Sequence, residues 1–172
     1  NNDKVGVIFF SDKIEKFIPA KKGKTHVLHI IRELLSFEPT SAGTDIAQAL
    51  QYFANAQKRH CTAFLISDFI GAGNMYQPLM IASNRHEVNA IQIYDRREAE
   101  LPNIGLVKFH DAETGNDLWV DTAITSVRDN YAQAWRDNQN EMQQLFTRTG
   151  VSHVSVRTDE DYVKALMHLF KC

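Results

Sequence analysis

Large apolar residues occur in short runs along this chain, separated by segments with helical spacing. Two of the runs are nearly continuous, Val5–Phe10 and Phe64–Phe69. Both are too short for typical helices, so they predict strands that are covered on both faces, as in the middle of a parallel sheet. Two further strands are expected over residues 88–95 and 151–157. A more polar run, Ile14–Pro19, ends in a proline and predicts an antiparallel edge strand.

Helical periodicity fills the spaces between these runs. An amphipathic helix is expected from Thr25 to Leu35, and a second from Ile46 to Phe53, where apolar residues recur at i, i+3, i+4 and i+7. Further helices are expected at about 75–84 and 126–149, and after residue 159. Strands that alternate with helices predict an α/β fold, with a three-layer, doubly wound, mainly parallel sheet of Rossmann-like topology.

The alternation is interrupted after Asp95. Residues 104–110 and 117–120 read as two strands that flank the turn 111–116, so we expect a β-hairpin inserted at about 103–122. A chain of 172 residues is most simply one domain, and we expect a single domain over 1–172.

Charge and cysteine content exclude several classes of function. The net charge of −2 argues against nucleic-acid binding and against binding to anionic membranes, which need a basic face. No apolar run approaches the length of a membrane span, and no signal peptide is recognisable. Two cysteines, Cys61 and Cys172, do not resemble a secreted disulfide framework, so we expect a reducing compartment.

Two side chains are candidates for binding chemistry. Asp68 follows a predicted buried strand, and the carboxyl ends of parallel strands form the crevice where ligands bind. Thr44 directly precedes Asp45 and the helix that begins at Ile46. A hydroxyl and a carboxylate are hard oxygen ligands of the kind that magnesium prefers. Thr44 and Asp68 are therefore candidate metal ligands.

Each candidate also has a structural alternative. Thr44 is a candidate N-cap of the following helix, and Asp68 a candidate acceptor for amides of its own loop. We expect Asp45 to complement the helix dipole rather than to bind a ligand. Asp95, at the end of the next strand, is expected to organise the turn into Arg96-Arg97.

Motifs of common enzymes are absent. The chain has no G-x-S-x-G elbow, no G-x-x-x-x-G-K-[ST] loop and no G-x-G-x-x-G turn. A nucleophilic Cys61 would need a histidine beside it, and the adjacent His60 would point to the other side of a strand. We therefore expect no catalytic activity.

The order of elements (strand, edge strand, helix, Gly-Thr-Asp helix, strand ending in Ser-Asp) resembles a von Willebrand factor type A domain. Thr44 and Asp68 match the threonine and the late aspartate of that family's metal-ion-dependent adhesion site. A more specific series is similar to the bacterial domain-of-unknown-function family numbered fifty-eight, a type A-like branch, and the resemblance covers essentially the whole chain. That series comprises Ile93–Glu98, Leu101-Pro102, Gly105, Asp111–Gly115 and Val120–Thr122.

One part of the type A pattern is missing. The D-x-S-x-S loop of the family sits on the first, central strand, and no such pattern occurs in this chain. The resemblance therefore implies a domain truncated at its N-terminus, with the missing ligands upstream of Asn1. It implies magnesium or manganese in the full-length protein, held in part by Thr44 and Asp68, and no tightly bound metal in this fragment.

The resemblance also implies a function. We expect a cytoplasmic bacterial protein that acts as a noncatalytic protein–protein interaction module, together with a MoxR-type AAA ATPase, in chaperone-like maturation or assembly of an unknown client protein. The metal would keep an open coordination position for a carboxylate of the partner. The alternative is a metal-dependent hydrolase of a phosphorylated small molecule in the same crevice, with Asp95 as the best candidate for its base.

The missing strand has a structural consequence. In a type A domain it lies between the strands Val5–Phe10 and Phe64–Ser67, so its absence would leave two unpaired edges. We expect either direct pairing of these two strands or a homodimer in which two copies fill each other's gap by strand exchange, and we favour the homodimer.

Overall fold

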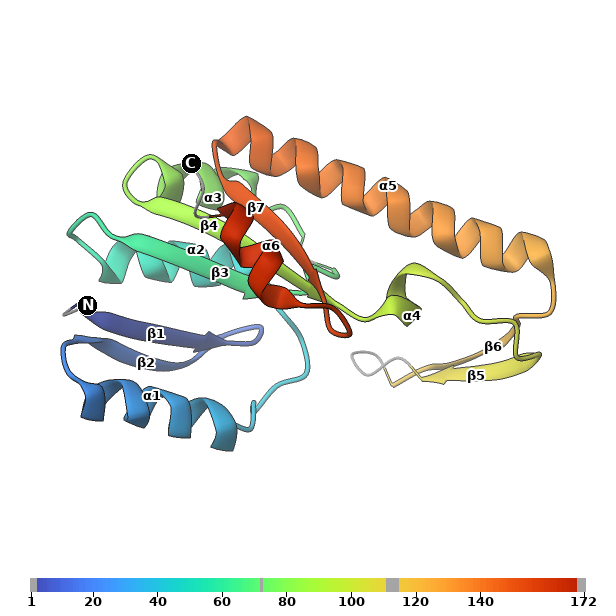
Figure 1. Ribbon diagram of the computed structural model, residues 1–172, viewed down its shortest axis with the longest axis horizontal. Coiled ribbons are helices and arrows are strands. Elements are labelled where there is room, and N and C mark those ends of the chain that lie inside the picture. The colour runs from blue at the N-terminus through green and yellow to red at the C-terminus, as the bar shows by residue number, and fades with distance from the viewer. Residues whose placement is uncertain (1–2, 72, 111–114, 170–172) are drawn as a thin grey trace. The chain divides into compact units, whose positions relative to one another are not determined.

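The computed structural model describes residues 3–71, 73–110 and 115–169 (Figure 1). The chain divides into two compact units. The first holds the chain up to Lys58 together with Gly71–Ala82, and the second holds Arg59–Ile70 and the chain from Ser83 onward. Each unit is built around its own small sheet.

The sheet of the first unit is an antiparallel pair, β1 (Val5–Phe10) and β2 (Ile14–Lys21). Its register runs from Val5 opposite Lys21 to Phe10 opposite Ile14, with irregularities near both ends. Gly6 lies at one of them, and a Cβ there would be 2.8 Å from the backbone nitrogen of Ala20, so only glycine fits. The expected edge strand is thus confirmed, and it continues two residues past its proline.

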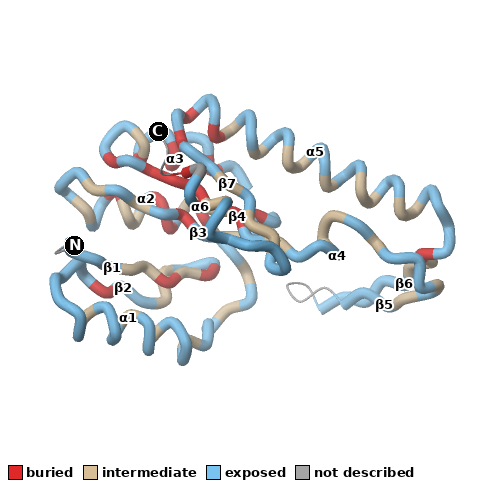
Figure 2. Tube along the Cα trace, viewed as in Figure 1, coloured by how far each residue is buried: buried red, intermediate tan, exposed pale blue. Residues whose placement is uncertain are grey.

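Three helices accompany this sheet, α1 (Lys24–Ser36), α2 (Ile46–Ala56) and α3 (Tyr76–Ser83). The apolar face of α2 is buried, with Ile46 fully inaccessible to solvent. Helix α1 confirms the expected helix but has no buried residue. Figure 2 shows α1 in pale blue and tan along its whole length, so its apolar side chains do not form a core.

The second unit holds a parallel sheet in the order β3-β4-β7, formed by β3 (Thr62–Ser67), β4 (Glu87–Tyr94) and β7 (Ser152–Arg157). Helices α5 (Thr125–Thr149) and α6 (Tyr162–Leu169) both pack against β7. The α/β class and its parallel sheet are confirmed, and β7 forms one edge of this sheet.

The expectation that β3 is covered on both faces is wrong. Leu65 is 8% exposed, whereas its neighbours Phe64 and Ile66 are 43% and 54% exposed. The central strand of this sheet is β4, where Val88 and Ala90 are buried. Successive side chains of a strand point to opposite faces, so Leu65 lies on the covered face of β3, and Phe64 and Ile66 lie on its exposed face.

The inserted hairpin is confirmed as a two-stranded antiparallel sheet of its own, β5 (Leu106–His110) and β6 (Asp117–Asp121). Residues 111–114 of its expected turn, like Cys172, lie outside the described residues. A one-turn helix, α4 (Arg96–Ala99), precedes the hairpin and was not anticipated. After α5 the chain turns at Gly150, whose φ of 67° is the left-handed conformation expected of a glycine C-cap.

The described strand ladders lie within the two units. In the described residues β1 pairs with β2, and β3 pairs with β4. The two outcomes expected from a missing strand are direct pairing of Val5–Phe10 with Phe64–Ser67 and strand exchange between two copies. Both stay predictions, as does the single truncated domain.

Candidate functional site

Asp68 lies at the carboxyl end of β3 in a tight turn whose amides are satisfied by side chains. The amide of Ile70 donates to Asp68 Oδ1 at 3.0 Å, and the amide of Phe69 donates to Ser67 Oγ at 3.1 Å. The alternative that Asp68 accepts hydrogen bonds from its own loop thus holds for one of its oxygens. Asp68 is exposed, and no hydrogen bond to its second oxygen is described, so that oxygen is a potential ligand.

The residue after Asp68 is conformationally unusual. Phe69 has a φ of 59°, and it is the only non-glycine residue with positive φ in the described chain. A bulky side chain in this region is strained by about 1–3 kcal/mol, and such strain persists only where the surroundings enforce it. Here Phe69 is 2% exposed, and its ring meets that of Phe146 edge-on at 5.4 Å. Burial of Phe69 therefore holds the turn that presents Asp68.

A buried glutamine fastens the same turn from the neighbouring strand. Gln92 of β4 is 5% exposed, and its Nε2 donates to the carbonyl oxygen of Asp68 at 3.2 Å. Its Oε1 accepts from Ser155 Oγ of β7 at 2.9 Å. A polar side chain buried inside a strand needs such partners. Sequence reasoning missed Gln92, although a glutamine within an apolar strand was a signal that could have found it.

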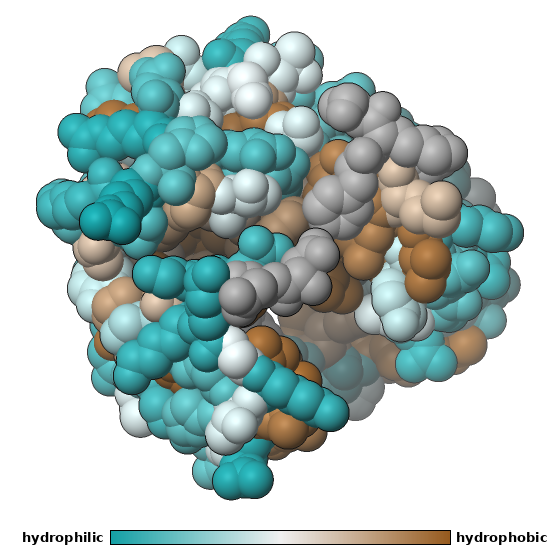
Figure 3. All heavy atoms as spheres, turned by 60° about the vertical axis from the view of Figure 1, so that its left-hand side comes forward, coloured by the Kyte–Doolittle hydropathy of each residue, from teal (hydrophilic) through white to brown (hydrophobic). Residues whose placement is uncertain are grey.

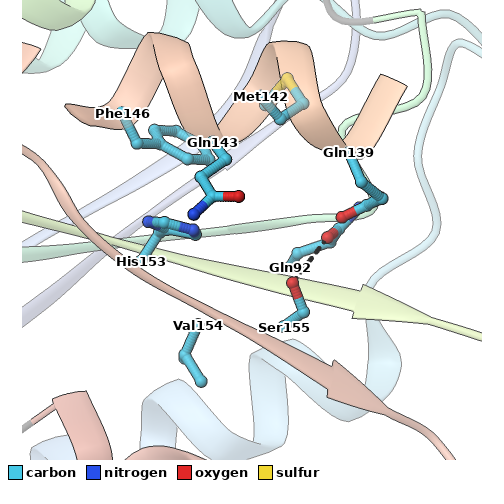
Figure 4. Close-up of a pocket in the computed structure, with 8 residues that line it drawn as sticks. All are labelled: Gln92, Gln139, Met142, Gln143, Phe146, His153, Val154 and Ser155. Carbon is cyan, nitrogen blue, oxygen red and sulfur yellow. Dashed lines mark hydrogen bonds between the residues drawn. The ribbon is translucent and has the colours of Figure 1, made fainter. Parts of the chain in front are cut away.

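A shallow cavity of about 170 Å³ opens beside Gln92, between α5 and the strands β4 and β7 (Figure 4). Its lining includes the amides of Gln139 and Gln143 and carries no acidic or basic side chain other than His153. The ring of His153 stacks on that of Phe146 at 5.2 Å, and desolvation lowers the pKa of His153, which favours a neutral imidazole. This lining offers no charge to a phosphate or to a metal.

Thr44 lies in the first unit, in a loop that is fastened to the β1–β2 turn. The carboxylate of Glu15 accepts from the amide and the hydroxyl of Thr40, at 3.0 and 2.7 Å, and from Ser11 Oγ at 2.8 Å. These hydrogen bonds, with Thr40 contributing most, hold the pKa of Glu15 below its ordinary value. The amide of Asp45 also donates to the carbonyl oxygen of Ser11 at 2.8 Å. The loop that carries Thr44 is therefore fixed at both ends.

The N-cap assignment goes to Asp45 and not to Thr44. Asp45 accepts from the amide of Gln48 at 2.8 Å and caps α2, so the alternative that Thr44 is the cap is wrong. The expectation that Asp45 serves the helix is borne out by this bond. Thr44 itself is exposed, and Asp12 lies close to the neighbouring Gly43, with its Cβ 3.4 Å from where a Cβ of Gly43 would be.

Thr44 and Asp68 offer oxygen atoms, which are the hard ligands that magnesium and manganese prefer. Magnesium, however, requires six oxygen ligands in octahedral geometry, and these two residues supply only part of that number. Thr44 belongs to the first unit and Asp68 to the second. Among the residues that the structure describes, no three of the types His, Cys, Asp and Glu come together as metal ligands.

Asp95 has the structural role expected of it. It caps α4 in a reciprocal box, accepting from the amide of Arg97 at 2.8 Å while its own amide donates to Glu98 at 3.0 Å. Its second oxygen accepts from Thr158 Oγ1 at 3.3 Å. Both oxygens of Asp95 are thus engaged in holding backbone and side chains.

A histidine does lie beside Cys61, and sequence reasoning missed it. The Sγ of Cys61 is 3.7 Å from Nδ1 of His86, which is 4% exposed. The two residues directly precede β3 and β4, whose first paired residues are Thr62 and Glu87, so the strand pairing brings them together. Burial raises the pKa of the Cys61 thiol. A protonated thiol is a poor nucleophile, so this pair offers a weak hydrogen bond rather than an activated cysteine.

Comparison with known proteins identifies the family. Residues 1–141 match the family described as "Protein of unknown function DUF58". The chain belongs to this family. An uncharacterized protein of Mycobacterium avium, MAV169, is 30% identical over 158 residues, covering 90% of this chain and 92% of that protein. The resemblance to the family numbered fifty-eight is thus confirmed.

Longer relatives also exist within this DUF58 family. Uncharacterized protein Rv1480 of Mycobacterium tuberculosis is 30% identical over 165 residues, which are 94% of this chain and 51% of that protein. The chain thus spans about half the length of such relatives.

Two solved structures share the fold of this chain. The conserved hypothetical protein BatB from Bacteroides thetaiotaomicron superposes with a TM-score of 0.56 at 16% identity, over 99% of this chain and 78% of that one. An aerotolerance-related membrane protein from Bacteroides fragilis superposes with a TM-score of 0.60 at 17% identity, over 100% and 81%. At these identities the likeness shows the fold alone. None of the helices described in this DUF58 chain is long and apolar enough to span a membrane.

Proposed function

We propose that this DUF58 chain is a noncatalytic protein–protein interaction module whose contact point is the turn that presents Asp68. The observation that carries the proposal is the enforced conformation of this turn. A buried phenylalanine at positive φ and a buried glutamine on the next strand both hold it, although Asp68 itself is exposed. Backbone strain that is maintained by packing concentrates at functional positions.

In a protein of the length of the longer relatives, Thr44 and Asp68 would supply two oxygen ligands to magnesium or manganese. The other ligands would come from outside residues 1–172. Such an ion, when bound, offers an open coordination position to an acidic side chain of the partner. The role of this chain is to hold the two oxygens in fixed loops, which the bonds of Glu15 and Gln92 support.

The proposed partner is a MoxR-type AAA ATPase, and the proposed process is the maturation or assembly of a client protein in the cytoplasm. Both rest on the family resemblance. The net charge of −2 supports a protein partner over nucleic acid.

Affinity measurements test this function. Purified MoxR-type ATPase is immobilised, and binding of the full-length protein is measured with magnesium and with a chelator, for wild type, Asp68→Ala and Thr44→Ala. The matched control is Asp129→Ala, an exposed acid on α5. We expect binding that requires magnesium and is weakened about tenfold or more by Asp68→Ala, but not by the control.

The same proteins test the alternative function. Turnover of generic phosphate esters with magnesium, lost in Asp68→Ala, would favour a metal-dependent hydrolase and contradict the interaction module. The engaged oxygens of Asp95 disfavour this outcome, because a general base needs a free oxygen.

A further inference from the structure

Helix α1 exposes a continuous apolar face. Its five large apolar residues at spacings of three and four are all solvent-exposed, with fractions from 37% to 83%. They are Val27, Leu28, Ile31, Leu34 and Leu35. Single exposed apolar residues are common, but a contiguous stripe of this kind marks an interaction surface. The lower part of Figure 3, where α1 lies in Figure 1, shows hydrophobic surface beside hydrophilic surface.

The opposite side of α1 explains why this face points outward. His26 contacts the carbonyl oxygen of Val5 through Nε2 at 2.9 Å, and Glu33 pairs with Lys16 of β2. His26, Ile30 and Glu33 are the half-buried residues of the helix. Residues 26, 30 and 33 follow one another at helical spacing, so they form the sheet-facing side. The polar contacts of this side fix the rotation of α1, and the apolar stripe is left in solvent.

The stripe is symmetric about Ile31. Moving outward, Leu28 and Val27 on one side correspond to Leu34 and Leu35 on the other. A two-fold axis through Ile31 would therefore place the apolar residues of one helix against those of an antiparallel copy. It would also place each Lys24 just past the end of the other copy's helix, whose last residue is Ser36.

The charges near the helix ends favour the same arrangement. Lys21, Lys22 and Lys24 lie at the start of α1, which has no acid in its first turn and no base in its last turn. This distribution is unfavourable for the dipole of an isolated helix. In an antiparallel pair the lysines of each copy would lie beside the partially negative end of the other. In the described residues Lys24 has no ion-pair partner within the chain.

We propose that α1 is a self-association surface that pairs antiparallel with α1 of a second copy, with Ile31 at the two-fold axis. Such a contact is isologous and closes at a dimer. The 13-residue helix is only about 20 Å long, so the contact is smaller than that of a standard stable interface. The dimer is therefore weak and forms in a concentration-dependent way.

Sedimentation velocity over a range of concentrations tests the proposal. Wild type shifts from monomer to dimer, and Ile31→Asp raises the dissociation constant by at least about tenfold, because the substitution occurs twice at the axis. The matched control is Leu118→Asp on β6, where the leucine is 65% exposed, and it leaves the association unchanged. Circular dichroism verifies that both variants fold, as expected for solvent-exposed positions.

A charge reversal separates the antiparallel pair from other modes of association. Lys24→Glu weakens the dimer about threefold at low salt, because it places a negative charge beside the partially negative helix end of the other copy, and high salt removes the effect. The matched control is Lys58→Glu, an exposed lysine outside α1, and it leaves the association unchanged. A monomer at all concentrations overturns the proposal and leaves the stripe to a different partner. A dimer that tolerates Ile31→Asp but is lost on Ile66→Lys at the β3 edge also overturns it, because strand exchange then accounts for the association.

Discussion

Replacement of Phe69 by glycine and by alanine tests the turn that presents Asp68. Both substitutions remove a ring that is 2% exposed, so both destabilise the fold, by about 3–5 kcal/mol in the case of alanine. They differ in the backbone. At a φ of 59°, alanine retains a left-handed strain of about 1–2 kcal/mol, whereas glycine has none.

The expected order of stability follows from two opposing terms. Relief of strain favours Phe69→Gly by about 1–2 kcal/mol. The larger freedom of glycine in the unfolded chain opposes it by about 0.4–1 kcal/mol. Phe69→Gly is therefore more stable than Phe69→Ala by about 0.5–1 kcal/mol. At Phe146, which touches Phe69 from within α5, the order is reversed, since glycine in a helix costs about 1 kcal/mol relative to alanine.

Urea unfolding followed by circular dichroism gives the four free energies. The two differences, glycine minus alanine at position 69 and at position 146, have opposite signs if the turn exists in solution as described. A Phe69→Gly variant that is less stable than Phe69→Ala by the same amount as at position 146 would refute the left-handed turn. The support for Asp68 as an enforced contact point would then be lost.

Three further results are expected. Asp45→Ala lowers the free energy of unfolding by about 1 kcal/mol through loss of the α2 cap, whereas Asp45→Asn, which retains a capping oxygen, does not; urea titration measures both. Thr40→Val raises the pKa of Glu15, which a carboxyl NMR titration measures. Because the pKa of Glu15 is lower in the folded chain than its unfolded value of about 4.5, the ionised carboxylate stabilises the fold above that pH, and this stabilisation is lost as pH falls. Thr40→Val therefore makes the free energy of unfolding depend less on pH in the acid range. For His153 the folded pKa is also lowered, so protonation favours the unfolded chain. The melting temperature therefore falls as pH drops below about 6.5, and His153→Gln reduces that fall.

Local pattern was enough to predict most elements of this chain. The runs that became β1, β3, β4 and β7 are dense in β-branched and aromatic residues, and the periodicity of α2 and α5 is that of an amphipathic helix. The helix end at Gly150 is also determined locally, because only glycine adopts the left-handed C-cap conformation without strain. These features depend on sterics within a few residues, so they can be read from the sequence.

Tertiary contacts decided the features that concern function. The periodicity of α1 predicted a helix but not its rotation, which the bonds of His26 and Glu33 to the β-pair set, with the apolar face outward. Cys61 and His86 lie close together because two strands pair. The hydrogen bond from Gln92 to the carbonyl oxygen of Asp68 joins residues that are 24 positions apart in the sequence. The cap is Asp45, one residue later than the Thr44 alternative, and the amide of Asp45 is bonded to the distant carbonyl oxygen of Ser11. Amino-acid preferences for helix, strand or turn act over a few neighbouring residues. The direction in which a helix face points, and the partners of a polar side chain, depend instead on which distant segments of the chain pack beside them.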